Sequence, residues 1–166
     1  MNKRVAVTVT LVILTVIFIS SSMTYQQQTI VPQLRELLPN EPWLSFLKTI
    51  QIHYNQEVVS VQTWGYYPFV EFLLRKLAHL TVFAVLAYGL FFVILDYMNV
   101  PWLTFLLAWL SSTGLAAFDE YHQFLTGGRT PAVQDIMIDS VGAFVASLCC
   151  LMAVYIVVYR RRRKSR

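Results

Sequence analysis

The sequence predicts an all-α polytopic membrane protein with four transmembrane helices, and two observations carry this prediction. Of its 166 residues, 57% are hydrophobic and 13% are charged, which is not the composition of an ordinary water-soluble domain. The apolar residues gather in four runs, each near the roughly 20 residues that a helix needs to cross the membrane. Such long, continuous runs favour helices over barrel strands, because the backbone must satisfy its own hydrogen bonds in lipid.

The four predicted spans differ in how they begin and end. The first carries no charged residue, and we interpret it as an uncleaved anchor, because residues 20–23 form a poor signal-peptide cleavage site. The second is polar on one side in its first two turns and then apolar except for a histidine, aspartates flank the third, and the fourth ends at a basic tail, residues 160–166. The expected spans are about Val5–Met23, about Phe69–Leu95, Val100–Phe118 and about Ala132–Tyr159.

The positive charges indicate which way the chain crosses the membrane. Eight of the thirteen Lys and Arg lie within residues 3–4 and 160–166. Cytoplasmic segments are enriched in these residues, so we expect both termini in the cytoplasm and the segments 24–68 and 119–130 outside it. The net charge of +4 is therefore a topology signal that also favours anionic lipid headgroups, and it does not indicate nucleic acid.

The long extracytoplasmic loop contains one predicted helix, within residues 40–50. Pro42 suits a first helical position, and Lys48 together with the short length argues against a span. The apolar side chains of this segment fall on one helical face: Trp43, Phe46, Leu47 and Ile50. We expect a short interfacial helix on the outer leaflet.

Ionisable residues collect where three of the spans meet the outer membrane face. Such groups cost about 2.5–3.5 kcal/mol each at a helix centre on insertion scales, so a dense set of them is a candidate site. The predicted topology brings the start of the second span, the end of the third and the start of the fourth to one layer. The candidate ligand-binding residues are Lys76, His79, Asp119, Glu120, Gln123, Arg129, Asp135 and Asp139.

Helical spacing predicts which of these side chains share a face. Residues three or four apart are neighbours on a helix surface, and a glycine on the same stripe lets another helix approach closely. The expected sets are Lys76 with His79, Glu71 with Arg75, Asp119 with Gln123, and Asp135 with Asp139 and Gly142. The third set requires the third helix to continue past Asp119.

A turn at Gly127–Pro131 precedes the last span. The glycines supply unusual dihedral angles, Thr130 can cap the following helix and Pro131 suits its first position. Free backbone N–H groups beside Arg129 form a candidate anion site. Lys76, Arg129 and this helix start would then hold an anion.

Three interpretations of the polar residues remain open. Ion pairs such as Arg129 with Asp135, or Lys76 with Asp119, would serve helix packing alone. General acid–base chemistry by Asp119 or Glu120 with His79 would make an intramembrane hydrolase or headgroup transferase. A binding cleft for a zwitterionic or anionic headgroup is the third. No recognised metal-ligand spacing is present, and we expect neither a metal nor another cofactor.

Four motifs together resemble the VanZ-like family. Lys76-Leu77-Ala78-His79 matches a Lys-x-x-His at the start of a membrane helix, and Asp119–Phe124 matches an Asp-Glu-x-x-Gln-x-Phe-like stretch. Gly128-Arg129 matches a Gly-Arg turn. Asp135–Gly142 matches Asp-x-x-x-Asn-x-x-Gly, with Asp139 where the family usually has Asn, and Phe83 stands where Tyr is common.

This resemblance implies a bacterial cell-membrane protein with one VanZ-like domain, residues 1–159, whose motifs lie within residues 71–159. The namesake of the family gives low-level resistance to the glycopeptide teicoplanin, which acts on extracytoplasmic cell-wall precursors. Our leading hypothesis is an outward-facing polar cleft that binds an envelope-derived or lipid-linked anionic ligand. The expected partners are membrane lipids and an envelope precursor or lipid headgroup, and neither the ligand nor the oligomeric state follows from the sequence.

Overall fold

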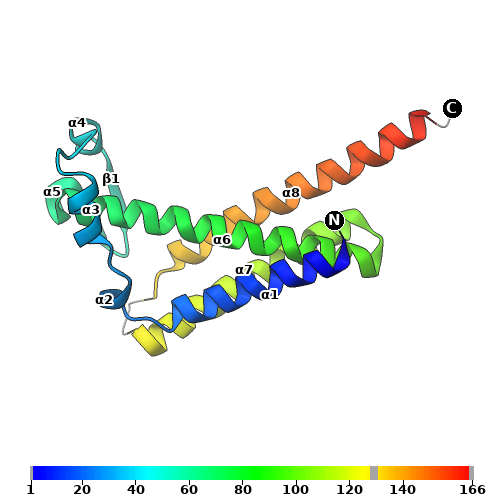
Figure 1. The fold of residues 1–166 in the computed structure, drawn as a ribbon, viewed down its shortest axis with the longest axis horizontal. Coiled ribbons are helices and arrows are strands. Elements are labelled where there is room, and N and C mark those ends of the chain that lie inside the picture. The colour runs from blue at the N-terminus through cyan, green and yellow to red at the C-terminus, as the bar shows by residue number, and fades with distance from the viewer. Residues whose placement is uncertain (1, 128–130, 165–166) are drawn as a thin grey trace.

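The computed structural model describes residues 2–127 and 131–164, and Figure 1 shows its arrangement. Long helices form the body of the described chain: α1 (Lys3–Ser21), α6 (Tyr66–Met98), α7 (Pro101–Gly127) and α8 (Val133–Lys164). Residues 24–65, here called the cap, form short elements at one end of it: α2 (Tyr25–Gln28), α3 (Val31–Leu37), α4 (Leu44–Leu47), β1 (Gln51–Tyr54), β2 (Glu57–Ser60) and α5 (Val61–Trp64).

Each of the four long helices is long and apolar enough to cross a membrane, which confirms the predicted all-α polytopic fold. Successive long helices run in opposite directions, so α1 begins where α6 ends and α7 begins, while the cap lies at the other end (Figure 1). An ion pair joins the start of α1 to the end of α6, where the Lys3 ammonium lies 3.3 Å from the Asp96 carboxylate.

Helix α6 is the centre of the bundle and packs against α1, α7 and α8. Two glycines allow its closest approaches. A Cβ on Gly142 would collide with the backbone carbonyl of Leu80, where α8 crosses α6, and a Cβ on Gly89 would lie 2.5 Å from the Thr10 hydroxyl of α1. The predicted role of Gly142 in helix packing is therefore confirmed.

The cap is built on a β-hairpin with its own apolar core. Strands β1 and β2 pair antiparallel, and the two turn residues between them, Asn55 and Gln56, have φ of 48° and 68°, as a tight hairpin turn requires. Its core consists of residues from the hairpin, α5 and the start of α6: Val59, Val61, Tyr66, Phe69 and Phe72. The cap and the start of α6 therefore share one apolar core.

Two expected limits of the long helices were wrong. The third span does not stop at Phe118, because α7 continues to Gly127. Pro131 lies before the first residue of α8, Val133, and does not occupy its first helical position.

The short helix expected within residues 40–50 is present as α4, although it covers only Leu44–Leu47 and does not start at Pro42. Trp43 precedes it in a left-handed conformation, with φ of 58°. The expected apolar face divides into two parts. Trp43 and Phe46 are exposed, while Leu47 and Ile50 pack against the core of the cap.

Candidate functional site

His79 lies where three hollows of the protein meet. The first, here called the Lys76 cavity, has a volume of about 160 Å³ and collects side chains from the cap, α6, α7 and α8, among them Tyr54, Arg75, Lys76, His79, Glu120, Gln123 and Asp135. Its lining confirms that Lys76 and His79 face the same cavity, as their spacing predicts. Three of the segments that contribute to it are far apart in the sequence, and the helical bundle brings them to one layer.

Lys76, Tyr54 and Asp135 form a closed triangle of polar contacts. The Lys76 ammonium pairs with Asp135 Oδ1 and donates to the Tyr54 hydroxyl at 2.8 Å, and this hydroxyl donates to Asp135 Oδ2 at 2.6 Å. Burial and the neighbouring Asp135 carboxylate raise the pKa of Tyr54, because both disfavour the phenolate. The structure thus gives Lys76 a partner other than Asp119, which the sequence had offered.

His79, about one helical turn along α6 from Lys76, pairs with Asp139. The His79 Nδ1 lies 3.5 Å from Asp139 Oδ2, and Asp139 is buried. The other oxygen of this carboxylate, Oδ1, is buried and has no hydrogen-bond partner among the described residues. Buried polar atoms are nearly always hydrogen-bonded, so this oxygen is available to a proton donor.

The two acidic residues at the end of α7 have different partners. Asp119 Oδ2 accepts a hydrogen bond at 2.7 Å from the amide of Gln123, as their spacing predicts, while its buried Oδ1 has no partner within the described chain. Glu120 Oε1 instead accepts the backbone N–H of Ala132 at 2.7 Å. Glu120 therefore ties the start of α8 to α7.

Two further hollows open from His79. The Asp119 cavity, about 90 Å³, lies between α1, α6 and α7 and is lined by Val16, Ile17, Ser20, Ser21, Ala78, His79, Val82, Phe83, Asp119 and Gln123. The Arg75 groove, about 400 Å³ and more open, lies between the end of α1, the cap and α6 and is lined by Ser20, Met23, Gln28, Ile30, Glu71, Leu74, Arg75, Ala78 and His79. Like His79, Ala78 and Ser20 line both the Asp119 cavity and the Arg75 groove.

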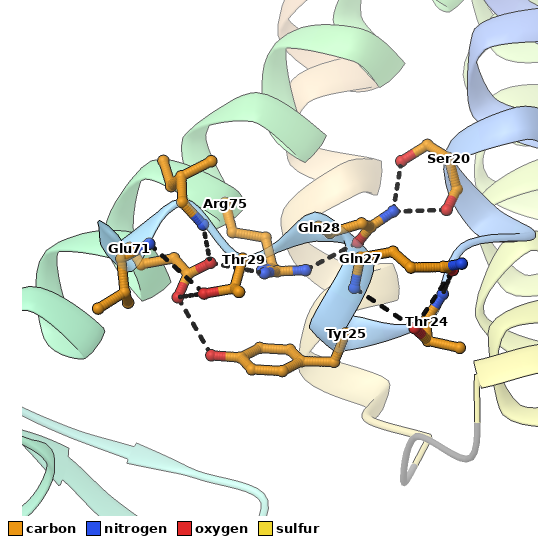
Figure 2. A network of polar contacts seen from close by, with 10 residues as sticks. Ser20, Thr24, Tyr25, Gln27, Gln28, Thr29, Glu71 and Arg75 are labelled. Carbon is orange, nitrogen blue, oxygen red and sulfur yellow. Dashed lines mark hydrogen bonds and ion pairs between the residues drawn. The ribbon is translucent and has the colours of Figure 1, made fainter. Parts of the chain in front are cut away.

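Glu71 and Arg75 form a second polar group that joins α6 to the cap (Figure 2). The buried Glu71 carboxylate accepts four hydrogen bonds: from Tyr25 at 3.2 Å, Thr29 at 3.1 Å, the Ile30 backbone N–H at 3.0 Å and Arg75 at 3.1 Å. The guanidinium of Arg75 also donates to Gln28 at 2.9 Å and covers the Tyr25 ring at 4.8 Å. The predicted Glu71–Arg75 pair is confirmed.

A third polar contact, unforeseen from the sequence, joins α1 to α7. The Ser21 hydroxyl lies 2.8 Å from His122 Nδ1, and the Thr126 hydroxyl donates to the Ser21 carbonyl at 2.9 Å. The His122 ring stacks on Phe18, with ring centres 5.3 Å apart. These contacts hold the end of α1 against the part of α7 that the sequence had assigned to a loop.

Seven of the eight predicted site residues can be placed. Six of them line the hollows that meet at His79, and the seventh, Asp139, pairs with His79. Arg129 lies outside the described residues. Tyr54 was not among the predicted residues, because it belongs to β1, a strand that was not expected. The signal for this strand is the alternation of polar and apolar side chains before Asn55. In the described part of the chain, no group of three or more His, Cys, Asp or Glu side chains is placed to hold a metal ion.

Comparison with known proteins gives one match. The family model described as VanZ/LLP1 matches residues 6–157, which is most of the 166-residue chain. No curated protein and no solved structure matched it. The matched range covers the cap, α6 and α7 and most of α1 and α8, and it includes each placed residue of the candidate site. The chain is therefore a multi-pass membrane protein that belongs to the VanZ/LLP1 family.

Proposed function

We propose that this protein binds the headgroup of a membrane lipid or of a lipid-linked envelope precursor in the hollows that meet at His79. The observation that carries the proposal is the meeting of three hollows at His79, among ionisable side chains contributed by α6, α7 and α8. A hollow of about 160 Å³ suits a headgroup better than a whole lipid, since pockets for drug-sized ligands hold about 300–1,000 Å³.

The unpaired carboxylate oxygens argue against helix packing as the only role of these residues. A packing network gains most when every buried polar atom has a partner, as Glu71 has, because an unpaired one costs about 1–3 kcal/mol. Asp119 Oδ1 and Asp139 Oδ1 are buried without a partner among the described residues. Retaining two such atoms is the pattern of a site that exchanges partners with a ligand.

Lys76 and Arg75 would receive the anionic part of the ligand. An ammonium has three N–H donors and a guanidinium five, and two of each are accounted for by Tyr54 and Asp135 and by Gln28 and Glu71. Both residues line the Lys76 cavity. An incoming phosphate would share each cation with its present partners.

The proposal places the cavity on the extracytoplasmic side of a bacterial cell membrane. The basic residues 160–164 end α8, and Lys3 and Arg4 begin α1. Both of these helix ends lie towards the opposite end of the bundle from the cap (Figure 1), and Lys and Arg favour the cytoplasmic side. The ligand would then enter the cavity from the extracytoplasmic side of the membrane. A role in glycopeptide resistance follows only if that ligand is a cell-wall precursor.

The test is lipid binding by the purified full-length chain in mixed micelles that contain phosphatidylglycerol or a long-chain polyprenyl phosphate. Binding is read from the fluorescence of Trp64, which lines the cavity. Lys76→Met should weaken binding by about tenfold or more, because a charge-assisted hydrogen bond is worth about 1.5–3 kcal/mol. The matched control is Lys48→Met, since Lys48 is an exposed lysine of the cap.

Because Lys76→Met leaves the Asp135 carboxylate without its cation, folding is checked by size exclusion and thermal unfolding. The double variant Lys76→Met with Asp135→Asn removes both charges and provides the test if the single variant unfolds. Wild-type affinity in a folded Lys76 variant would overturn the proposal. In cells, teicoplanin susceptibility compared between the wild type and the same variants decides the link to resistance.

One observation favours a second candidate, a headgroup hydrolase or transferase. The carboxylate of Asp139 is placed to orient His79, 3.5 Å from Nδ1, and a carboxylate that orients a histidine is a recurring element of acid–base catalysis. In this alternative His79 would exchange a proton with the ligand, and Asp119 would be the second acid–base group. Glu120 is less suited, since it holds the Ala132 N–H. Release of a free headgroup during the binding experiment would favour the enzyme.

A further inference from the structure

We infer that the ligand is an aminophospholipid, that its headgroup enters between α1 and α6 through the Arg75 groove, and that Asp119 binds its amine. This inference rests on the proposed function and names the class of ligand. It depends on three observations: a groove open beside the cap, lining residues that this groove shares with the Asp119 cavity, and a buried carboxylate oxygen that has no hydrogen-bond partner among the described residues.

The Arg75 groove has the lining that a phospholipid needs at the level of its headgroup. Three exposed apolar residues, Met23, Ile30 and Leu74, line it. Arg75 and Gln28 line it as well. Apolar and cationic groups side by side suit the junction between the acyl chains and the phosphate of a lipid.

Arg75 is held in one orientation at this groove. The Glu71 carboxylate and the Gln28 amide each fix one N–H direction, and the guanidinium lies over the Tyr25 ring (Figure 2). Guanidinium groups bind phosphate oxygens with good geometry. A lipid phosphate in the groove would therefore lie against Arg75, next to His79.

The Asp119 cavity lies beside the groove, and its buried carboxylate gives it the opposite charge preference. Ser20, Ala78 and His79 line both hollows, so a headgroup with its phosphate in the groove can extend past His79 toward Asp119. Asp119 is 5% exposed, and its Oδ1 has no partner among the described residues. A buried carboxylate without a cation is costly, and a primary ammonium supplies both a positive charge and three N–H donors.

The size of the Asp119 cavity limits the group that enters it. Its volume is about 90 Å³, and the side chains beyond the polar end are apolar, among them Ile17, Val82 and Phe83. A primary amine on a short alkyl stem matches this lining. A trimethylated amine has no N–H to donate, and a glycerol headgroup has no charge to offer Asp119.

The first test compares three lipids on the unmodified full-length protein in mixed micelles: phosphatidylethanolamine, phosphatidylcholine and phosphatidylglycerol. Phosphatidylethanolamine should bind about tenfold or more tightly than either of the others, as expected for one charge-assisted contact. Equal affinity for the three lipids, or preference for phosphatidylglycerol, overturns the inference while the proposed function stands. Absence of binding by all three lipids overturns the inference, and absence of binding by the polyprenyl phosphate as well overturns the proposed function.

Two variants test the positions. Asp119→Asn keeps the shape of the side chain and should abolish the preference for phosphatidylethanolamine, with little change for phosphatidylglycerol. Ala78→Trp should weaken binding of all three lipids, because Ala78 lines both hollows. Its matched control is Leu77→Trp, since the neighbouring Leu77 is 59% exposed and should tolerate a bulky side chain.

Two results would overturn the assigned positions. One is an unchanged preference for phosphatidylethanolamine in folded Asp119→Asn, which would exclude Asp119 as the amine-binding group. The other is equal binding by the Ala78→Trp and Leu77→Trp proteins, which would exclude the passage at Ala78. If Asp119→Asn does not fold, the comparison of the three lipids on the unmodified protein still decides the headgroup preference.

Discussion

Replacing Glu71 by alanine should release the cap from the helical bundle. The Glu71 carboxylate accepts four hydrogen bonds, three of them from residues 25–30 and one from Arg75. Glu71→Ala removes all four acceptors and leaves the Arg75 charge without its carboxylate. Breaking a buried ion pair by removal of one partner costs about 3–5 kcal/mol, so we expect a loss of this size in the stability of the cap.

Amide hydrogen exchange measures this loss where it should occur. A change of 1.4 kcal/mol corresponds to tenfold in an equilibrium constant, so amides in residues 24–38 should exchange roughly a hundredfold faster or more in Glu71→Ala. Amides in the middle of α6 should not change. Glu36→Ala is the control, because Glu36 is an exposed carboxylate of α3, and it should alter stability by no more than about 0.5 kcal/mol.

The reasoning fails if exchange in residues 24–38 is no faster in Glu71→Ala than in Glu36→Ala. That result would mean that the apolar core of the cap, and not the Glu71 contacts, holds α2 and α3 against α6. Glu71→Gln refines the test. Its amide still accepts from the Ile30 N–H and can donate to the hydroxyl of Thr29, so the increase in exchange should be smaller than for alanine.

Two further predictions concern stability. Gly142→Leu should destabilise the bundle by about 1–3 kcal/mol or more, as overpacking does, because a Cβ there meets the Leu80 carbonyl; unchanged thermal unfolding relative to Val141→Leu, at an exposed neighbour, would refute it. The pKa of the Tyr54 phenol is raised from 10.0 in the folded protein, so just above pH 10 this phenol ionises in the unfolded state alone. The free energy of unfolding should therefore fall as the pH rises through this range. Tyr54→Phe should lack that part of the fall, and parallel curves of stability against pH for the two proteins would refute this reasoning.

The transmembrane helices were predictable because their signal is local. Each apolar run by itself predicts a membrane-spanning helix, whatever neighbours that helix contacts in the fold. The end of the third span was misplaced for a related reason. Hydropathy stops at Asp119, but α7 continues because Asp119, Glu120 and Gln123 are buried against other elements, and a helix can carry polar residues wherever they find partners.

The partners of the polar residues were less predictable, because they depend on how each helix is rotated. The sequence offered Asp119 to Lys76 and Arg129 to Asp135, whereas Lys76 pairs with Asp135 in the structure. Tyr54 contacts both Lys76 and Asp135 and so favours this pairing, and it reaches the site only through the fold of the hairpin. Spacing within one helix, by contrast, correctly predicted the pairs Glu71 with Arg75 and Asp119 with Gln123.

The crossing of α6 and α8 at Leu80 and Gly142 divides the site into a fixed part and an adjustable part. His79 and Asp139 lie within one turn of this contact, so their separation is set by two backbones that cannot move apart without loss of packing. Lys76 and Asp135 lie a turn further out, where a small rotation of α8 about the crossing produces a larger displacement. Tyr54 bridges this outer pair, so a shift of the cap would change the position of the Lys76 ammonium and leave the His79–Asp139 spacing unaltered.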